Sequence, residues 1–503
     1  MKHEKLSEAM DQIDPQYLED AAKPKKPFRF PTAAFAWAAV LALVILCIPL
    51  VQQIQKNRET NITPTLAASG DAMMQETAAP ESPMEHGHGN PLYSYSISYP
   101  AYPSMAPYPT DETDMSQSDA YYESRREQYD QPKGYADSLH TFWMTSIPEV
   151  LSGEENAVYS PINTYMALAM LAETAEGNTR QQILDVLGAQ SIEALRTQAG
   201  YVWNAHYCAD GATTLLLGNS LWMDDTLLYN KETANLLAND YYAAVYHGDL
   251  QSETMNQAMQ DWLNAHTGNL LQDQVRDLTF EDDTLMGLAS TIHYKVKWMD
   301  AFEESQTTSE IFHTPTGDVT ADFMHCTQHT GTYFYGEDFG AVMLATEDRS
   351  TMWLILPDEG LTPKDLLESG HAMDMIFSYA SPHDYPNTAY VRINLSVPKF
   401  DVASDLELKE PLCRMGITDV FQEGTADFSA ISPDPLFLSR VQHAGRVMID
   451  EEGIDAAAYT MMLYCGSAMP PEEEIDFVLD RPFLFVIESN DGLPLFVGVV
   501  NEP

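Results

Sequence analysis

A segment near the C-terminus, residues 451–476, combines the properties of an exposed loop with those of a β-strand. Its sequence is EEGIDAAAYTMMLYCGSAMPPEEEID. Gly453 provides a flexible joint, and neither Pro nor Gly interrupts the run from Ile454 to Cys465, so this run is able to adopt extended backbone. Because side chains alternate along a strand, Ile454 lies on one face and Asp455 on the other. The pattern predicts a strand that can enter a sheet with Asp455 facing solvent.

The strand face that begins with Ile454 carries no charged side chain, and this determines whether the face can be buried. Its side chains are those of Ile454, Ala456, Ala458, Thr460, Met462 and Tyr464. Burying a charge there would be costly, whereas these side chains can be buried without an unpaired charge. If this strand inserted into a sheet, the uncharged face could therefore be buried while Asp455 faces solvent.

The chain carries none of the common catalytic or nucleotide-binding motifs. It contains no GxSxG, GxxxxGK[ST], HExxH or GxGxxG. Cys208, Cys326 and Cys413 have no evident acid–base partner and are interpreted as buried thiols. His86 and His88 are two histidines in a flexible segment, which makes them weak metal ligands. We predict a protein that is not an enzyme and has no cofactor and no metal site.

Short blocks between Tyr135 and Pro503 resemble, in the same order, those of the serpin family of serine protease inhibitors. The clearest are Asn-x-x-x-Ser-Pro at 156–161, Gly-Asn-Thr-x-x-Gln-Ile at 177–183, Val-Pro-Lys-Phe at 397–400, Glu-Glu-Gly at 451–453 and Asp-Arg-Pro-Phe at 480–483. Any single block is common, but the ordered set is specific. The resemblance implies an α+β fold with helices around a large central β-sheet and an exposed reactive loop.

The resemblance also implies a mechanism for residues 451–476. The loop would be bait for a protease, the enzyme would form an acyl bond, and the loop would then insert as a new central strand, driven by strain in the native state. Ile454 stands where serpins usually have Thr or Ser, and an apolar β-branched side chain should allow insertion. The implied hinge residues are Glu451, Gly453, Ile454, Ala456, Ala457, Ala458 and Thr460.

The implied reactive bond is Ser467–Ala468. In many serpins the bond follows the fourteenth residue after the hinge glycine, which is Ser467 here, and Pro470-Pro471 lies where prolines are expected. Loop lengths vary, so Cys465–Gly466 and Tyr464–Cys465 remain open. A small serine suits the shallow apolar pocket of elastase-like or subtilisin-like serine proteases, and the loop has no Arg or Lys for a trypsin-like enzyme.

A second implied site is the region where the central sheet opens. Asn163 stands where the family usually has Ser, and Ser290 where it usually has Asn. This matched exchange could preserve the hydrogen bonding, although it leaves the energetics of opening unsettled. The residues implied here are Ser160, Asn163, Ser290, Trp298 and His443.

Helical patterns come first along residues 133–503 and strand patterns later, which predicts an α+β domain rather than a βαβ repeat. Pro161 suits the first turn of a helix, and Asn178-Thr179 reads as the N-cap of a helix from Arg180 to Leu187. Another helix is expected over 139–151. Strands are expected over 351–356, 391–397, 444–449, 483–487 and 495–500.

The N-terminal region predicts a membrane anchor. Residues 33–51 are 19 residues without a charge, about the length that a helix needs to cross a bilayer. More basic residues precede this run than follow it, which favours a cytoplasmic leader over 1–30, a transmembrane helix over 31–53 and an extracellular C-terminal part. A cleaved signal peptide is the alternative. The leader weakly resembles those of anchored Firmicutes proteins, which suggests a Gram-positive-type bacterium, although a solvated tail that merely precedes the anchor is the favoured interpretation.

Residues 54–132 are rich in Pro, Tyr and Ser without apolar periodicity, and are expected to form a disordered stalk. The formal net charge of the chain is −49, and residues 1–60 are nearly neutral, so the acidity lies in the stalk and domain. Such acidity excludes nucleic acid as a partner.

These observations together predict a monomeric inhibitor of serine proteases, anchored in the cell membrane, with the serpin domain outside and the protease held in a covalent acyl complex. The alternative is a non-inhibitory serpin-fold ectodomain that binds or senses.

Overall fold

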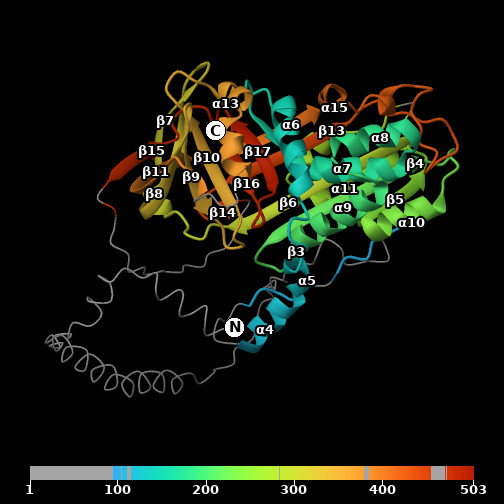
Figure 1. The fold of residues 1–503 in the computed structure, drawn as a ribbon, viewed down its shortest axis with the longest axis horizontal. Helices are drawn as coiled ribbons and strands as arrows, with labels where there is room; N and C mark the ends of the chain where they lie inside the picture. The colour runs from blue at the N-terminus through green and yellow to red at the C-terminus, as the bar shows by residue number, and fades with distance from the viewer. Residues whose placement is uncertain are drawn as a thin grey trace, which may run out of the picture. The chain divides into compact units, whose positions relative to one another are not determined.

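The structure, a computed structural model, describes residues 95–503 except for 104, 110–114, 282–283, 379–383, 455–470 and 472 (Figure 1). The described residues belong to one compact unit, Ala78–Pro503. The expected leader, membrane helix and first part of the stalk lie outside the described residues, as do Ala456, Ala457, Ala458, Thr460, Ser467 and Ala468. Among the described residues, none of the helices combines the length and the apolar character that crossing a membrane requires.

The first sheet has the strand order β1-β5-β4-β6-β14-β13-β12, with β3 paired to β4. Its strands are β1 (Ser96–Ser98), β3 (Cys208–Ala209), β4 (Thr214–Asp224), β5 (Ala243–Gly248), β6 (Met286–Lys297), β12 (Phe400–Glu407), β13 (Gln442–Ile449) and β14 (Gly453–Ile454). The two-residue strand β14 is all that joins β6 to β13. It pairs Gly453 with Lys297 and Ile454 with Val296 on one side, and Ile454 with Ile449 on the other. Elsewhere in the described chain β6 and β13 do not pair with each other.

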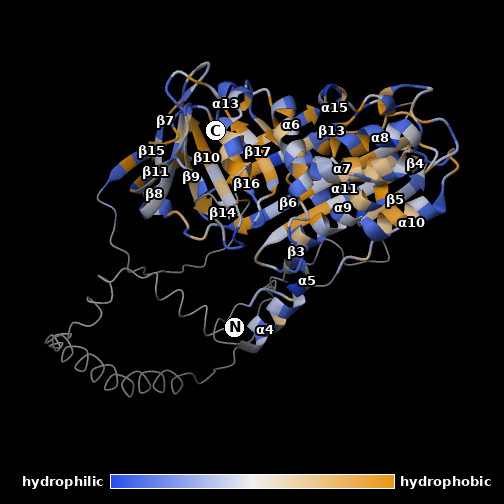
Figure 2. Ribbon diagram, viewed as in Figure 1, coloured by the Kyte–Doolittle hydropathy of each residue, from blue (hydrophilic) through white to orange (hydrophobic). Residues whose placement is uncertain are grey.

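The second sheet has the strand order β15-β11-β8-β9-β10-β16-β17-β2, with β7 paired to β8. Its strands are β2 (Ala157–Tyr159), β7 (Thr308–Thr314), β8 (Gly317–Tyr335), β9 (Phe339–Ala345), β10 (Thr351–Pro357), β11 (Thr388–Pro398), β15 (Glu474–Val478), β16 (Phe483–Glu488) and β17 (Pro494–Val500). Every residue of β2 and β17 is buried, so these strands are covered on both faces. Figure 2 shows hydrophobic residues gathered on β16 and β17 and hydrophilic ones along the peripheral loops.

The longer helices lie beside the first sheet, where α7, α9 and α11 run with β4, β5 and β6 (Figure 1). The helices are α4 (Met115–Ser124), α5 (Arg126–Tyr129), α6 (His140–Val150), α7 (Pro161–Thr174), α8 (Gly177–Val186), α9 (Ile192–His206), α10 (Lys231–Asp240), α11 (Glu253–His266), α12 (Gln272–Val275), α13 (Pro363–Ser369), α14 (His371–Phe377) and α15 (Lys409–Met415). Short 3-10 turns are η2 (Asp137–Leu139), η3 (Glu304–Gln306) and η5 (Asp419–Phe421).

Helix α7 fixes the position of the sheet-opening residues. Pro161 occupies its first turn, and the hydroxyl of Ser160 caps it by accepting the amide of Asn163 (3.3 Å). Nearly all side chains of α7 are buried, because the helix packs on β6, β17, α8 and α9. The polar side chain of Asn163 is therefore carried into the interior by a helix that has little freedom to move.

The expected α+β class and the five expected strands are confirmed, since each strand range falls within β10, β11, β13, β16 or β17. The helix expected over 139–151 is α6, preceded by η2. One boundary was wrong. The helix expected from Arg180 begins at Gly177, with Glu176 as its N-cap residue. Thr179 does not cap it, because its buried hydroxyl accepts the amide of Asp427 (3.0 Å).

The structure departs from the expected disordered stalk over its last part, residues 95–132. Strand β1 pairs with β5 and so covers an edge of the first sheet. The ring of Tyr102 packs against Trp203, Tyr207 and Tyr242, with ring centroids 5.8–5.9 Å apart. The aromatic residues of this segment pack on a hydrophobic surface of the domain. Apolar periodicity in the sequence does not predict this packing, because the surface is built by other segments. We call the described residues of 95–132 the N-terminal arm.

Replacing Tyr102 with Ala should lower the free energy of unfolding by about 2 kcal/mol, less than for a fully buried aromatic residue. Denaturation of residues 78–503 in guanidinium chloride measures this change, and limited proteolysis should cut the arm faster in the variant. Tyr122→Ala is the control, because that side chain is 57% exposed. Equal stability of the two variants would show that the arm does not pack as described.

Candidate functional site

The hinge is a tight turn that leads from β13 into β14. The side chain of Asp450 accepts the amides of Glu452 (2.9 Å) and Gly453 (3.2 Å), and the amide of Asp450 donates to the carbonyl of Gly453 (3.1 Å). The turn delivers Ile454 into the first sheet, where its side chain is 2% exposed. Ile454, near the N-terminal end of residues 451–476, thus already lies between β6 and β13.

Trp298 holds this turn from the side of β6. Its indole Nε1 donates to the carbonyl of Asp450 (2.9 Å), and its backbone amide donates to the carbonyl of Glu452 (3.0 Å). The amide of Phe302 donates to the carbonyl of Glu451 (2.9 Å). Three successive carbonyls of the turn are therefore bound by one short segment, which ties the hinge to the end of β6.

Glu451 anchors the hinge through its side chain. One carboxylate oxygen accepts the hydroxyl of Thr307 (2.7 Å), and the other lies 2.7 Å from Nζ of Lys399. Burial alone would raise the pKa of Glu451, but the hydrogen bonds from Lys399 and Thr307 hold it below its ordinary value. The carboxylate remains charged at neutral pH and binds the turn to the loop between β11 and β12.

The other implied residues form one network, the sheet-opening cluster of Ser160, Asn163, Ser290 and His443. The side-chain amide of Asn163 donates to the backbone carbonyl of Ser290 (3.0 Å), and the hydroxyl of Ser290 contacts the side-chain oxygen of Asn163. The exchanged residues therefore bond directly to each other. On the other side, Nε2 of His443 accepts the backbone amide of Ser160 (3.0 Å).

His443 must be neutral to accept this bond. Its ring is 5% exposed and lies edge-to-face against Tyr159, with ring centroids 5.4 Å apart. Burial lowers the pKa of His443 to about 4. The proton of the neutral ring lies on Nδ1, which leaves Nε2 free as an acceptor.

Two contributing residues were not among the sequence candidates. Asn219 pairs with Ser290 across β4 and β6, accepts the hydroxyl of Ser290 (2.9 Å) and donates to the carbonyl of Tyr241 (2.9 Å). Asp450 shapes the hinge turn. Only the strand register places Asn219 at Ser290, whereas an Asp three residues before Gly453 is a local turn signal that could have been noticed.

The structure separates Trp298 from the residues with which it was grouped. Trp298 contacts the hinge at Asp450 and Glu452, while the sheet-opening cluster lies where α7 meets β6 and β13. The sites are thus a hinge site (Asp450 to Ile454 with Trp298, Thr307 and Lys399) and the sheet-opening cluster.

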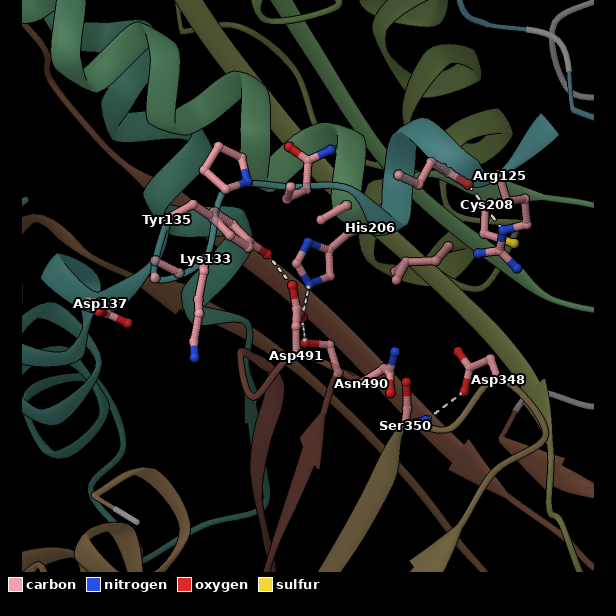
Figure 3. Close-up of a pocket in the computed structure, with 18 residues that line it drawn as sticks. Arg125, Lys133, Tyr135, Asp137, His206, Cys208, Asp348, Ser350, Asn490 and Asp491 are labelled. Carbon is pink, nitrogen blue, oxygen red and sulfur yellow. Dashed lines mark hydrogen bonds and ion pairs between the residues drawn. The ribbon is translucent and has the colours of Figure 1, made fainter. Parts of the chain in front are cut away.

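A polar cavity of about 320 Å³ lies apart from both sites (Figure 3). His206 is fully buried; its Nδ1 donates to the carbonyl of Val202 (2.7 Å), and its Nε2 lies 3.1 Å from Asp491. Burial alone would lower the pKa of His206, but Asp491 raises it above its ordinary value. Ser489 and Tyr135 also donate to Asp491. The charges of His206 and Asp491 are thus paired with each other. Burial raises the pKa of the nearby Cys208 thiol, so this thiol is not an activated nucleophile.

Comparisons with known proteins agree with this geometry. A family model described as Serpin (serine protease inhibitor) matches residues 141–503. Alpha-1-antiproteinase S of Cavia porcellus is 28% identical over 384 residues, which cover 74% of this chain and 90% of that protein.

Solved structures share the fold at lower identity. The native state of the thermophilic serpin tengpin matches with a TM-score of 0.65 and 22% identity, covering 79% of this chain and 98% of that one. A thyroxine-binding globulin in complex with thyroxine matches with a TM-score of 0.58 and 22% identity, covering 73% and 97%. The shared fold extends over nearly the whole of the tengpin chain.

The direct bond between Asn163 and Ser290 predicts coupling between the two positions. Asn163→Ser and Ser290→Asn should each lower the free energy of unfolding by about 1–2 kcal/mol, because each leaves a buried polar group without its partner. The double variant should lose less than the sum, by at least about 0.5 kcal/mol. Guanidinium chloride denaturation measures all three. Asn239→Ser, at an exposed position of α10, should change little. Strict additivity would refute direct coupling.

The buried neutral His443 predicts a loss of stability in acid. Its pKa is about 6.5 in the unfolded chain and about 4 in the fold, so the unfolded state binds the proton first. The stability that it contributes is fully present above pH 6.5 and is lost as the pH falls towards 4. The stability difference between the parent and His443→Gln should therefore shrink from pH 7.5 to pH 5.

The difference in stability between the parent and His443→Gln excludes the contributions of the other titrating groups. Burial lowers the pKa of His266 to about 4 and raises that of Glu488 to about 7, and these two groups contribute with opposite signs. They contribute equally to parent and variant, so they cancel in the difference. A difference that is constant with pH would contradict a neutral, hydrogen-bonded His443.

Proposed function

The chain belongs to the serpin family, and from this premise we propose that it inhibits serine proteases by suicide cleavage followed by insertion of its reactive loop. The observation that carries the proposal is the position of Ile454. This residue pairs with Val296 on β6 and with Ile449 on β13, while the rest of these two strands stay unpaired to each other in the described chain. The sheet has a place for one further strand, and β14 is where that strand begins.

The register of β14 supports the proposal further. Extending its antiparallel pairing along β6 sets Asp455 opposite Lys295 and Tyr464 opposite Met286, the first residue of β6. Lys295 is half-buried, and a cross-strand carboxylate beside it would be favourable. The run without Pro or Gly, Ile454 to Cys465, therefore has the length that β6 can pair with, and its one early charge meets an opposite charge.

The fine specificity is part of the proposal. Ser467–Ala468 is the proposed reactive bond, with Cys465–Gly466 and Tyr464–Cys465 as the alternatives. The small Ser467 favours an elastase-like or subtilisin-like serine protease, which would be held as a covalent acyl complex by a monomeric inhibitor. The family description and the name of the guinea-pig relative, an antiproteinase, agree with inhibition in general.

The location is likewise proposed from sequence. The uncharged residues 33–51, with more basic residues before them than after, support a single-pass anchor with the N-terminus in the cytoplasm and the serpin domain outside. Bacterial origin remains a prediction from the leader alone.

A non-inhibitory role in binding or sensing is the second candidate. A thyroxine-binding globulin shares the fold, so the architecture is compatible with ligand carriage. A buried Ile454 also fits a loop that is held partly inserted and does not act as bait.

A single gel separates these candidates. Residues 78–503 incubated with pancreatic elastase or with subtilisin should give an SDS-resistant adduct, because acylation is trapped by insertion. Mass spectrometry of the released C-terminal peptide should find Ala468 at its N-terminus. Cleavage by both enzymes without any adduct would reject inhibition and favour the second candidate.

Ile454→Arg provides the matched test of insertion. A charge at this buried position should turn the inhibitor into a substrate and raise the stoichiometry of inhibition at least tenfold. Ile454→Thr is the control and should stay close to the parent. An unchanged stoichiometry in the arginine variant would show that Ile454 does not lead the insertion.

A further inference from the structure

A second cavity, of about 250 Å³, lies between the first residues of β6 and those of β13, in the part of the first sheet where these strands are not joined. Helices α7, α11, α12 and α15 and the first residues of both strands surround it. Most of its lining is apolar, with Leu171, Met259 and Val275 from the helices and Leu288 from β6, and Asn163, Ser290 and His443 of the sheet-opening cluster also line it. We call this space the lane cavity.

Small side chains where two strands separate account for the lane cavity. Ala167 on α7, Ala289 on β6 and Ala444 on β13 line it, and each of these alanines is half-buried. Apolar cavities of about 150 Å³ stay dry and bind small apolar molecules such as benzene. The lane cavity is larger than that and smaller than the roughly 300–1,000 Å³ of sites for drug-sized ligands.

The polar groups of the lane cavity restrict the chemistry of a ligand. The side-chain oxygen Oε1 of Gln274 is buried and has no hydrogen-bond partner among the described residues, so it is available to accept a proton donor. Glu281 and Asp405 also line the space. The cation Arg440 is already shared between Glu281 (3.9 Å) and Glu407 (3.4 Å). An anionic ligand would therefore face an excess of carboxylates.

We propose that the lane cavity is a binding site for a small, neutral, largely apolar molecule that carries one hydrogen-bond donor, and that the bound molecule obstructs loop insertion. The first half stands on the cavity alone, and the second half rests on the proposed function. In the register of β14, the residues that would pair with Met286–Thr291 of β6 are those of 459–464. A ligand bound between β6 and β13 at this level leaves open the space next to Ile454, where insertion begins. It blocks the space that residues 459–464 would fill.

Binding is tested with 1-aminoanthracene, a neutral three-ring amine whose fluorescence rises in apolar surroundings. It should bind to residues 78–503 with saturation. Ala167→Met and Ala289→Met, which fill the lane cavity from two different elements, should each weaken binding at least tenfold. Ala403→Met is the matched control, because Ala403 is a half-buried alanine of the same sheet that does not line the cavity. Unchanged binding in both filling variants, with melting temperatures near the parent's, would overturn the site.

Competition tests the predicted ligand class. 1-Decanol donates one hydrogen bond and is neutral, whereas decanoate has the same chain and a negative charge. The alcohol should displace the probe at a concentration at least tenfold lower than the carboxylate. Stronger displacement by decanoate would overturn the assignment of a neutral ligand and would point to Arg440 as the anchor.

Two measurements test the link to insertion. Saturating probe should raise the stoichiometry of inhibition at least twofold, and protein cleaved in its loop, with the higher melting temperature that insertion produces, should lose probe binding. If the cleaved, inserted protein binds the probe as before, the site is not on the insertion path. If no protease forms an adduct with the parent protein while the probe still binds, the proposed function fails and the binding site stands.

Discussion

The structure depends on one constraint: β6 and β13 lie in the same sheet but are joined at one end only, through Gly453 and Ile454. Strand edges inside a sheet leave backbone groups that need other partners. The sheet-opening cluster supplies some of them, since the side chain of Asn163 bonds the carbonyl of Ser290 on β6. His443 on β13 accepts an amide from the start of α7. The side chain of Asn163 on α7 thus binds β6, and the backbone amide of Ser160, the N-cap residue of α7, binds the side chain of His443 on β13.

The closed end of the sheet is held by a different kind of contact. There Trp298 and Phe302 bind the carbonyls of the hinge turn, and Glu451 is fixed by Lys399 and Thr307. The hinge turn is therefore held at several points, by bonds to its backbone carbonyls and to the side chain of Glu451, whereas the sheet-opening cluster consists of a few buried bonds.

The charged residues of the domain are arranged differently in its interior and at its surface. Two of the buried ionic groups are paired at short range, Glu451 with Lys399 and His206 with Asp491. The excess of acidic residues remains at the surface, where it favours solubility and opposes self-association. The N-terminal arm also opposes self-association, because β1 covers the edge of β5, which would otherwise be exposed to pairing with another chain.

Much of the fold could be predicted from the sequence, because its signals are local. Short strand-like runs located β10, β11, β13, β16 and β17, Ser160-Pro161 marked the start of α7, and the resemblance of ordered blocks supplied the architecture. The uncharged face that begins at Ile454 could also be read directly, since strand alternation is fixed by the backbone.

Only the tertiary structure decided which distant residues meet. Asn163 and Ser290 are 127 positions apart and Ser290 and Asn219 are 71 apart, and their contact depends on strand register and on the packing of α7. Trp298 joined the hinge for the same reason. The arm was missed because its aromatic residues have no periodicity of their own and are ordered by a surface that other segments build. The sequence by itself determined what each segment can become, whereas the partners of buried polar and aromatic groups were decided by long-range packing, which local pattern does not encode.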